Sequence, residues 1–379
     1  MTLHVSQVTM IGTFPPPMHG MAVVNAAVRE RLLASAVSVV VINTAPASLD
    51  RAMLTRLGRL PRVTSGLARL AGTRRLRGAL YIGVSGGLGQ IYDVGFLLLA
   101  RLRRMRVFVH HHSFAYLYQR HCLAALLVWI AGRRALHITQ SAGMAGRLRE
   151  LYGASNVAAV SNAVFLVDRT TQVHARPRQM LRALGFLGNI ATEKGICEFL
   201  DLMAVVRQFG LQLEGRIAGP FQDAATELRV RQRLQDLPNV EYSGAKYGAE
   251  KDAFFTGIDA LVFPTLYANE AEPLVVHEAL QHALPVIAYG RGCIPEVVTS
   301  QCGCVIPPAE PFVPTALAQV EAWMSVPERF QTASVAAAAR SKALRMEHAQ
   351  HWQTLEKCML GRESPSSVLQ AIDGAAPGR

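Results

Sequence analysis

The chain has 379 residues, of which 50% are hydrophobic and 17% are charged, so a largely disordered chain is excluded and two hydrophobic cores are expected. The net charge of +12 is concentrated in the first half, because residues 1–175 carry 20 Arg, no Lys and 5 acidic residues. Such a field attracts polyanions, which include nucleic acid, an anionic membrane face and a phosphorylated substrate.

The opening residues, MTLHVSQVTMIGTF, alternate like a strand and lack the basic and apolar regions of a secretory leader. The longest apolar run, CLAALLVWIAG, is shorter than the roughly 20 residues that span a bilayer. The six cysteines are scattered without CxxC spacing and are expected to be reduced thiols. We therefore expect a cytosolic protein that can lie on a membrane surface.

In chain order, short β-rich runs alternate with helix-like segments. HVSQVTMIG is followed by MAVVNAAVRERLLAS, and the alternation continues through GALYIGVSG, RVFVHHH and ALHITQS to VAAVSNAV. Near-continuous Val, Ile and Leu runs are typical of parallel strands that helices cover on both faces. Residues 1–170 are therefore predicted to form one Rossmann-like domain.

A polar segment at residues 168–179 contains Pro177 and is predicted to be a linker. The alternation restarts at LRALGFLGNI and continues to GCVIPP, which predicts a second Rossmann-like domain over residues 180–345. Two such α/β domains in tandem indicate a cleft between them. Residues 315–361 are predicted to be helical, and the final SPSSVLQAIDGAAPGR is predicted to be loose.

The stretch EAEPLVVHEALQ places Glu270 and Glu278 eight positions apart. Glu270 follows the strand-like run IDALVFPT, at the carboxyl end where α/β sheets bind ligands. Pro273 suits a first helical turn, so the N–H groups of Leu274 and Val275 are predicted to hold an anion such as a diphosphate. Glu278, one turn further along, is placed to accept hydrogen bonds from a pair of vicinal hydroxyls such as those of ribose.

The longer stretch EAEPLVVHEALQHALPVIAYGRGCIPEVV resembles the signature of the group 1, or family 4, retaining glycosyltransferases. Glu270 and Glu278 match the two glutamates of that signature. Gly292, Pro295 and Glu296 match the Gly-Pro-Glu element that follows it. The resemblance implies a GT-B fold, in which two Rossmann-like domains face each other across a cleft. It also implies that Glu270 lies beside the donor sugar and that Glu278 binds the ribose of the nucleotide.

Two further segments resemble motifs of the same family. FLGNIATEKGICEFL resembles the Gly-Arg-x(4)-Lys-Gly segment that holds the donor diphosphate, with Lys194 and Gly195 as the matches. Asn189 stands where the family usually has Arg, which leaves one cation fewer for the diphosphate. GTFPPPMHGMAVVN resembles the N-terminal glycine-rich loop that approaches the donor phosphates and sugar, with His19 and Gly20 as the matches.

The run RVFVHHHSFAY ends a predicted strand in three histidines, of which alternation sends His110 and His112 to the same face. No Asp, Glu or Cys accompanies them at metal-ligand spacing, so zinc is not expected. The family often has a histidine after this strand, close to the donor sugar, and His112 is the best match, with His110 as the alternative. The nearby VSGGLGQIYD lacks G-x-G-x-x-G spacing and is expected near the cleft without an assigned role.

Residues 51–78 carry eight Arg and no acidic residue, with Leu and Met interleaved. This composition predicts contact with an anionic headgroup surface, and a solvated loop and helix is the alternative. Nucleic acid is not expected, because no reader motif and no basic-aromatic interleaving is present. MEHAQHWQTLEKCML, at residues 346–360, resembles the family's closing helix, which returns to the first domain, so residues 346–379 are expected to be that helix and a loose tail.

The expected function is that of a retaining, hexosyl-type glycosyltransferase, with a nucleoside diphosphate sugar as co-substrate and no metal or other cofactor. His112 and Glu270 are the expected catalytic residues. The expected acceptor is a membrane-held saccharide linked to polyprenyl diphosphate, used in exopolysaccharide or glycoconjugate synthesis at the inner face of the plasma membrane. The alternatives are a GT-B-shaped epimerase, a hydrolase that uses the two glutamates as acid and base, and an inactive scaffold or binding protein, which Asn189 would favour.

Overall fold

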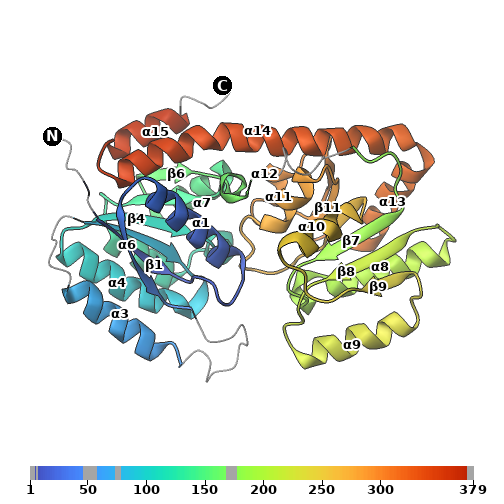
Figure 1. Ribbon diagram of the computed structural model, residues 1–379, viewed down its shortest axis with the longest axis horizontal. Helices are drawn as coiled ribbons and strands as arrows, with labels where there is room; N and C mark the ends of the chain where they lie inside the picture. The colour runs from blue at the N-terminus through green and yellow to red at the C-terminus, as the bar shows by residue number, and fades with distance from the viewer. Residues whose placement is uncertain (1–4, 6, 46–57, 73–77, 168–176, 374–379) are drawn as a thin grey trace. The chain divides into compact units, whose positions relative to one another are not determined.

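The computed structural model describes residues 5, 7–45, 58–72, 78–167 and 177–373. The chain divides into two compact units, Met1–Phe165 with Arg345–Arg379, and Leu166–Leu344. Each unit contains a six-stranded parallel sheet with helices against it (Figure 1). The prediction of an α/β fold with two Rossmann-like domains is therefore confirmed.

The sheet of the first unit has the strand order β2-β1-β3-β4-β5-β6. All six residues of β3, ALYIGV, are buried, as expected of a strand that helices cover on both faces. The strands are β1 Gln7–Gly12, β2 Ser38–Asn43, β3 Ala79–Val84, β4 Arg106–His111, β5 Leu136–Thr139 and β6 Val157–Ala159.

Local signals set the ends of helices in the first unit. In α7 the Ser141 hydroxyl accepts from Met144 N at 3.1 Å, and Gly153 ends the helix in the left-handed region with φ 65°. The helices are α1 Gly20–Ala34, α3 Leu60–Gly72, α4 Gln90–Leu102, α5 Ala115–Tyr118, α6 Cys122–Ala131 and α7 Ala142–Tyr152.

The sheet of the second unit has the order β12-β11-β10-β7-β8-β9. Its core includes Phe186 of β7 and Phe199 of α8, whose ring centres lie 5.8 Å apart. The strands are β7 Ala183–Leu187, β8 Glu214–Ala218, β9 Val240–Tyr242, β10 Ala260–Phe263, β11 Val286–Tyr289 and β12 Gly303–Ile306. The helices are α8 Ile196–Gln208, α9 Ala224–Gln235, α10 Gly248–Thr256, α11 Leu274–Gln281, α12 Ile294–Val297 and α13 Phe312–Ser325.

In each sheet the strand order reverses direction beside the first strand. In the second unit the reversal lies between β7 and β10, and in the first unit it lies between β1 and β3. Chain segments that leave two such strands run to opposite sides of the sheet, so their loops separate and leave room for a ligand. The loops after β7 and β10, and those after β1 and β3, are therefore the positions where a site is expected.

A single helix of 33 residues, α14 Pro327–Met359, contributes to both units, because the division falls at Arg345. In the first unit its buried Trp352 packs against Phe165, with 5.0 Å between ring centres. The segment after it forms α15, Pro365–Asp373, which contacts β6 and buries Val368. The prediction of a loose tail is wrong for these residues, because a tertiary contact orders them.

Some predictions fall outside the described residues. These are most of the linker, at residues 168–176, the end of the tail at residues 374–379, and the parts of the arginine-rich segment at residues 51–57 and 73–77. Among the helices that the structure describes, none combines the length and the hydrophobicity needed to cross a bilayer.

Candidate functional site

Lys194 and Glu270 form an ion pair at the switch point of the second sheet. Lys194 closes a short 3-10 turn, Thr192–Lys194, between β7 and α8, while Glu270 lies in the loop after β10. The distance from Lys194 Nζ to Glu270 Oε2 is 2.5 Å, and Thr265 Oγ1 donates to the same oxygen at 3.2 Å. Because Glu270 is buried, its charge requires such partners. The two motifs that the sequence analysis treated separately are thus in direct contact.

Two glycines allow the backbone around this pair to pack closely. Gly195 has φ 88°, and a Cβ there would lie 2.1 Å from the carbonyl oxygen of Pro264. Gly292 has φ 55°, and a Cβ there would lie 2.5 Å from the carbonyl oxygen of Glu270. Only glycine fits these positions. Gly195 therefore lets the loop that carries Lys194 reach the loop after β10, and Gly292 supports the backbone of Glu270.

Helix α11 begins at Leu274, shortly after Glu270. Pro273 precedes the helix with φ −70°, and no side chain caps this end. The N–H groups of Leu274 and Val275 have no carbonyl four residues earlier within the helix, and they lie at the positive end of its dipole. Leu274 is partly exposed, whereas Val275 is nearly buried. This end of α11 therefore offers backbone donors and a positive potential to an anion.

Glu278 lies one turn further along α11. It is paired with a lysine that the sequence analysis did not identify. Lys251 of α10 donates to both carboxylate oxygens, at 2.7 Å to Oε1 and 2.6 Å to Oε2. Both side chains are partly exposed. The two residues are 27 positions apart on different helices, so no local spacing indicates the pair. Because a carboxylate has about four lone-pair sites, Glu278 can accept further hydrogen bonds while Lys251 holds it.

The remaining predicted residue of this unit, Asn189, is partly exposed in the loop after β7. A second pair, which joins the loop before α11 to the helix, also escaped the sequence analysis because it is buried within the motif itself. His277 Nε2 lies 3.1 Å from Glu272 Oε1, and both side chains are almost inaccessible. Glu272 and His277 therefore belong to the interior of the unit, in contrast to Glu278.

In the first unit, His112 follows the last residue of β4 and is partly exposed, whereas His110 is fully buried. The two rings lie on the same side of the strand, with 4.0 Å between their centres. His110 Nδ1 lies 2.6 Å from the hydroxyl of Tyr81, which donates to Asn25 Oδ1 at 3.1 Å. Asn25 in turn donates to the carbonyl of Thr13 at 3.0 Å. His110 therefore serves this buried network and supports the ring of His112.

His111 points to the opposite face of the sheet, as the alternation of a strand requires. Its Nε2 lies 2.9 Å from His137 Nδ1, and its Nδ1 lies 2.8 Å from the hydroxyl of Tyr116. Within the part of the chain that the structure describes, no group of three or more His, Cys, Asp or Glu side chains is arranged to hold a metal ion.

His19 and His112 are neutral at neutral pH. Burial lowers the pKa of His112 to about 3, and His19 lowers it further. Burial, followed by the charge of Arg59, lowers the pKa of His19 to about 4. Both imidazoles can therefore make hydrogen bonds to a ligand without adding charge. Gly20, the first residue of α1, has open space around its Cβ position.

Asp93 lies in α4, after the glycine segment that the sequence analysis left without a role, and it is buried. Its carboxylate accepts a hydrogen bond from Ser85 N at 3.1 Å. Burial raises the pKa of Asp93 to about 7, although the Ser85 hydrogen bond and the charge of Arg59 oppose this shift. Helix α4 thus places a carboxyl with a pKa of about 7 next to the loop that follows β3.

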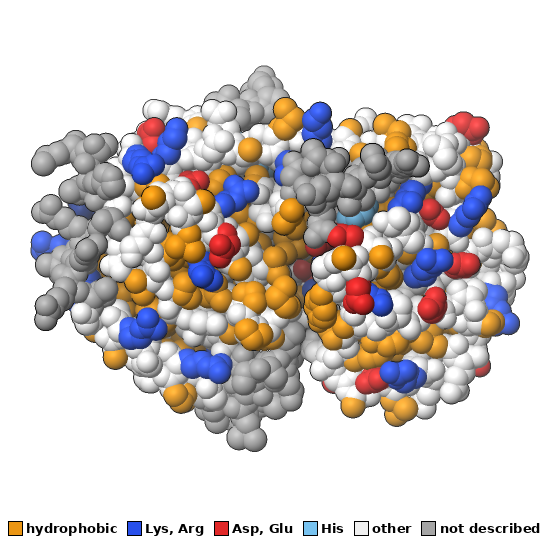
Figure 2. Space-filling view, in the orientation of Figure 1, with side chains coloured by type: hydrophobic (Ala, Val, Ile, Leu, Met, Phe, Trp, Pro, Cys, Tyr) orange, Lys and Arg blue, Asp and Glu red, His pale blue; other side chains and the backbone are white. Residues whose placement is uncertain are grey.

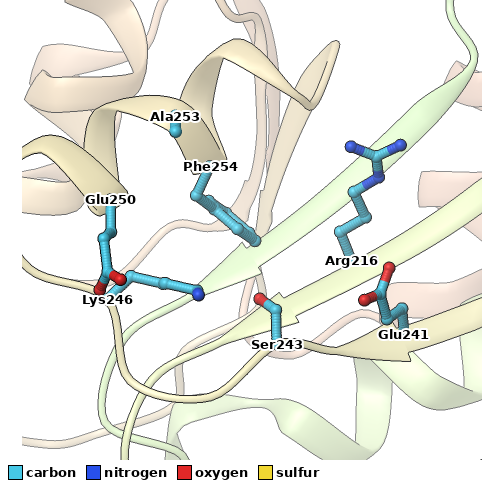
Figure 3. Close-up of a pocket in the computed structure, with 7 residues that line it drawn as sticks. All are labelled: Arg216, Glu241, Ser243, Lys246, Glu250, Ala253 and Phe254. Carbon is cyan, nitrogen blue, oxygen red and sulfur yellow. The ribbon is translucent and has the colours of Figure 1, made fainter.

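A separate cavity of about 310 Å³ lies under α10 in the second unit. Figure 3 shows Phe254 pointing from α10 toward strands β8 and β9, which contribute Arg216 and Glu241. None of the residues predicted from the sequence lines it. The full lining is Arg216, Glu241, Ser243, Lys246, Glu250, Ala253 and Phe254.

Comparison with known proteins points to glycosyltransferases, both in sequence and in fold. Residues 182–320 match the family model described as glycosyl transferases group 1. No curated protein matches the sequence. Among solved structures, HepE of Anabaena in complex with UDP has a TM-score of 0.65 at 15% identity, covering 92% of this chain and 99% of HepE. Sucrose-phosphate synthase of Thermosynechococcus elongatus has a TM-score of 0.65 at 16% identity, with coverage of 92% and 99%. WaaG, a glycosyltransferase involved in lipopolysaccharide biosynthesis, has a TM-score of 0.56 at 14% identity, with coverage of 97% and 100%.

Proposed function

We propose that the protein is a retaining glycosyltransferase that uses a nucleoside diphosphate sugar. In support, residues 182–320 match the model described as glycosyl transferases group 1, and the fold is similar to that of HepE. In the reaction, the bond between the anomeric carbon and the diphosphate breaks, the acceptor oxygen bonds to that carbon on the same face, and the acceptor loses a proton. The observation that carries the proposal is the contact between Lys194 and Glu270 at the switch point of the second sheet, directly before the first turn of α11.

The leaving diphosphate is stabilised by charge and by hydrogen bonds. Lys194 and the N–H groups of Leu274 and Val275 donate to its oxygens, which is electrostatic stabilisation by groups already in place. Asn189 contributes an amide donor but no positive charge. Lys194 therefore supplies a larger share of the positive charge that stabilises the diphosphate than it would in relatives with an arginine at this position. Glu278 accepts from the ribose hydroxyls. The proposal requires no metal ion, because the lysine and the helix end offset the charge that develops.

The sugar is bound by groups that carry hydrogen bonds rather than net charge. Glu270 accepts from the sugar hydroxyls, and Lys194 and Thr265 fix its orientation. His112 and His19 of the first unit are neutral donors or acceptors for the transferred group. Gly20 is assigned to the same site because it begins α1 directly after His19 and has open space around its Cβ position, which leaves room for a ligand.

For the acceptor we propose a saccharide linked to polyprenyl diphosphate at the inner face of the plasma membrane, used in exopolysaccharide or glycoconjugate synthesis. The support is the positive charge of residues 1–175, which carry 20 Arg and 5 acidic residues. A diphosphate anchor in an anionic membrane is attracted by such a field. Because HepE has been solved with UDP-glucose, uridine diphosphate sugars are the first donors to test.

The test is a transfer assay with labelled UDP-glucose and other nucleoside diphosphate sugars, in which the anomeric configuration of the product is read by NMR. Wild type is compared with Lys194→Ala and with the control Lys342→Ala, which removes an exposed lysine of the same unit. We expect a product with the donor's configuration, lost only in Lys194→Ala. Release of an epimerised sugar nucleotide would indicate an epimerase, and nucleotide binding without turnover of any donor would indicate a binding protein.

A further inference from the structure

Helix α4 presents an apolar stripe to solvent. Ile91, Leu98 and Leu102 are all exposed, and their spacing of seven and four positions places them on one side of the helix. Leu102 is 72% exposed. The opposite side of α4 is the one that packs inward, with Phe96 and Leu97 buried. A surface helix of a soluble protein normally has the reverse arrangement, with polar residues outward.

The neighbouring helix α6 continues this apolar surface. It has no charged residue, and its Leu126 and Trp129 are exposed, Trp129 to 71%. Arg101 of α4 joins the two helices, because it donates to the carbonyl of Trp129 at 3.1 Å and its guanidinium lies 5.9 Å from the centre of the Trp129 ring. We call the exposed residues Ile91, Leu98, Leu102, Leu126 and Trp129 the apolar ridge.

Basic residues border the ridge, and acidic residues are absent from its part of the sequence. Arg103 and Arg104 follow α4, and Arg133 and Arg134 follow α6. Residues 94–149 contain no Asp or Glu, and Asp93 is buried. At the lower left of the first unit, where Figure 1 draws α3 and α4, Figure 2 shows hydrophobic and basic side chains and no acidic side chain among the described residues.

The described part of the arginine-rich segment contributes mainly positive charge here, although Leu60 at the start of α3 is exposed. In α3 the apolar residues Val63 and Leu70 are buried in the protein, so they are not available to a bilayer as the sequence had suggested. Arg62 and Arg69 of α3 remain exposed. Helix α3 contacts α4, and it therefore adds positive charge beside the apolar ridge.

We propose that the apolar ridge and its arginines form a docking surface for an anionic phospholipid bilayer. Exposed Leu, Ile and Trp side chains enter the boundary between headgroups and acyl chains, while arginines contact the phosphates. Charge complementarity selects this occupant, because the arginine border of a second copy would repel itself. A nucleic acid would engage the arginines but leave the aliphatic residues in water. The surface does not depend on the proposed glycosyl transfer, and binding to vesicles that lack acceptor and donor tests it separately.

Tryptophan fluorescence gives a direct readout. The chain has three tryptophans, and Trp129 is exposed whereas Trp323 and Trp352 are only 4% and 2% exposed. We expect the emission of the full-length protein to shift to shorter wavelength with vesicles of phosphatidylcholine and phosphatidylglycerol, and not with phosphatidylcholine alone. Brominated acyl chains should quench the shifted emission. In Trp129→Phe the shift should vanish while sedimentation with the vesicles persists, because phenylalanine keeps the site apolar.

Matched variants test the surface itself. The double variant Leu102→Ser with Trp129→Ser removes the two most exposed ridge residues. We expect its partition coefficient for the anionic vesicles to fall by roughly tenfold or more. The control is Phe209→Ser with Leu228→Ser, which removes residues that are 62% and 61% exposed in the second unit. The control should bind as wild type does. Because all four side chains are exposed, thermal melting is expected to be unchanged in both double variants.

Three results would overturn the proposal. One is equal vesicle binding by the ridge variant and the control. Another is a wild-type dimer in sedimentation velocity that the ridge variant cannot form, which would assign the surface to a second copy. The third is an unshifted Trp129 emission in the presence of saturating anionic vesicles.

Discussion

At the residue scale, the pair of Lys251 and Glu278 carries the clearest consequence for nucleotide binding. Lys251 holds both carboxylate oxygens, so it fixes the orientation in which Glu278 can meet two ribose hydroxyls. We predict that Lys251→Ala weakens nucleoside diphosphate affinity by roughly tenfold, equivalent to about 1.4 kcal/mol. Isothermal titration calorimetry measures this change.

The control for this prediction is Lys342→Ala, which removes one exposed positive charge from the second unit. If Lys251 acted only through net charge, the two variants would lose affinity equally, and high salt would abolish both effects. A tighter complex in Lys251→Ala would contradict the orienting role, because it would mean that Lys251 competes with the ribose.

We expect Lys194 and Glu270 to stabilise the fold as a pair. Glu270 is buried and Lys194 is partly exposed, so Lys194→Met leaves a buried carboxylate without its cation, and we predict a loss of about 2 kcal/mol in the free energy of unfolding. The double variant with Glu270→Gln should lose less than the sum of the single variants. Urea unfolding of the four proteins measures the cycle. Additive losses would contradict the contact.

The residues that escaped the sequence analysis have one property in common, because folding rather than a local motif brings each of them to its partner. Lys251 is a partner of Glu278 only because α10 and α11 are neighbours, and Thr265 reaches Glu270 only because the loop after β10 turns back. The sequence analysis singled out Lys194, Glu270 and Glu278 because they match family motifs and lie near the end of a strand or the start of a helix. A local signal identified them, whereas tertiary packing supplied their partners.

At the scale of elements, Gly195 fixes the approach of the loop after β7 to the loop after β10. Both Gly195 and Gly210 have positive φ, at 88° and 68°, but only Gly195 has a neighbour where a Cβ would lie. We predict that Gly210→Ala costs about 1 kcal/mol from backbone conformation alone. Gly195→Ala should cost at least about 2 kcal/mol more, and nucleotide binding should be lost, because the Lys194 loop must move.

Thermal unfolding of both glycine variants, with and without nucleoside diphosphate, measures this difference. Equal losses of stability in Gly195→Ala and Gly210→Ala would show that backbone strain from the positive φ accounts for the whole effect. A stable Gly195→Ala protein that still binds the nucleotide would contradict the requirement for close contact between the two loops.

Helices α3 and α15 illustrate what composition does and does not predict. The arginines and leucines around α3 led to the prediction of contact with an anionic headgroup surface, but the structure buries the apolar residues Val63 and Leu70 in the protein. The sequence of α15 contains two serines and a proline and was predicted to be loose, yet Val368 anchors it in the first unit. In both cases the partner of the apolar side decides the outcome, and that partner lies far away in sequence.

At the scale of the whole molecule, the first unit contains a group of buried histidines with lowered pKa values. Burial lowers the pKa of His110, His111, His112 and His137, to about 3 for His112 and about 4 for His137. The unfolded chain therefore binds more protons than the folded chain below the ordinary value of 6.5. Each histidine reduces the free energy of unfolding by about 1.4 kcal/mol for each pH unit below that value.

Asp93 acts in the opposite direction. Its folded pKa, about 7, exceeds the ordinary value of 3.8, so the folded state binds the extra proton between these values and gains stability as pH falls. His19, whose pKa is about 4, acts in the same direction as these four histidines. Five histidines outweigh one carboxyl, and we predict a net loss on the order of 5 kcal/mol per pH unit below pH 6. Hydrogen exchange at several pH values should show the first unit losing protection before the second. A pH-independent first unit would contradict this prediction.

The alternation of strands and helices predicted both sheets, because parallel strands buried on two faces have recognisable apolar runs. The family resemblance then placed Glu270, Glu278, Lys194 and Gly195 in one domain, and the structure brings Lys194 against Glu270. Donor identity has no such signature in the sequence, since the loops that contact a base or a sugar vary without changing the fold. The same limit applies to the acceptor.

The most direct test of the nucleotide site is a thermal-shift titration with UDP, GDP, ADP and CMP. Wild type is compared with Glu278→Gln and with the control Glu214→Gln, which alters an exposed glutamate of the same unit. A ligand at about a hundred times its dissociation constant adds roughly 2.7 kcal/mol to the folded state. We predict that one nucleoside diphosphate stabilises wild type and the control but not Glu278→Gln. A uniform lack of response, or an equal response in Glu278→Gln, would contradict the assignment of this site.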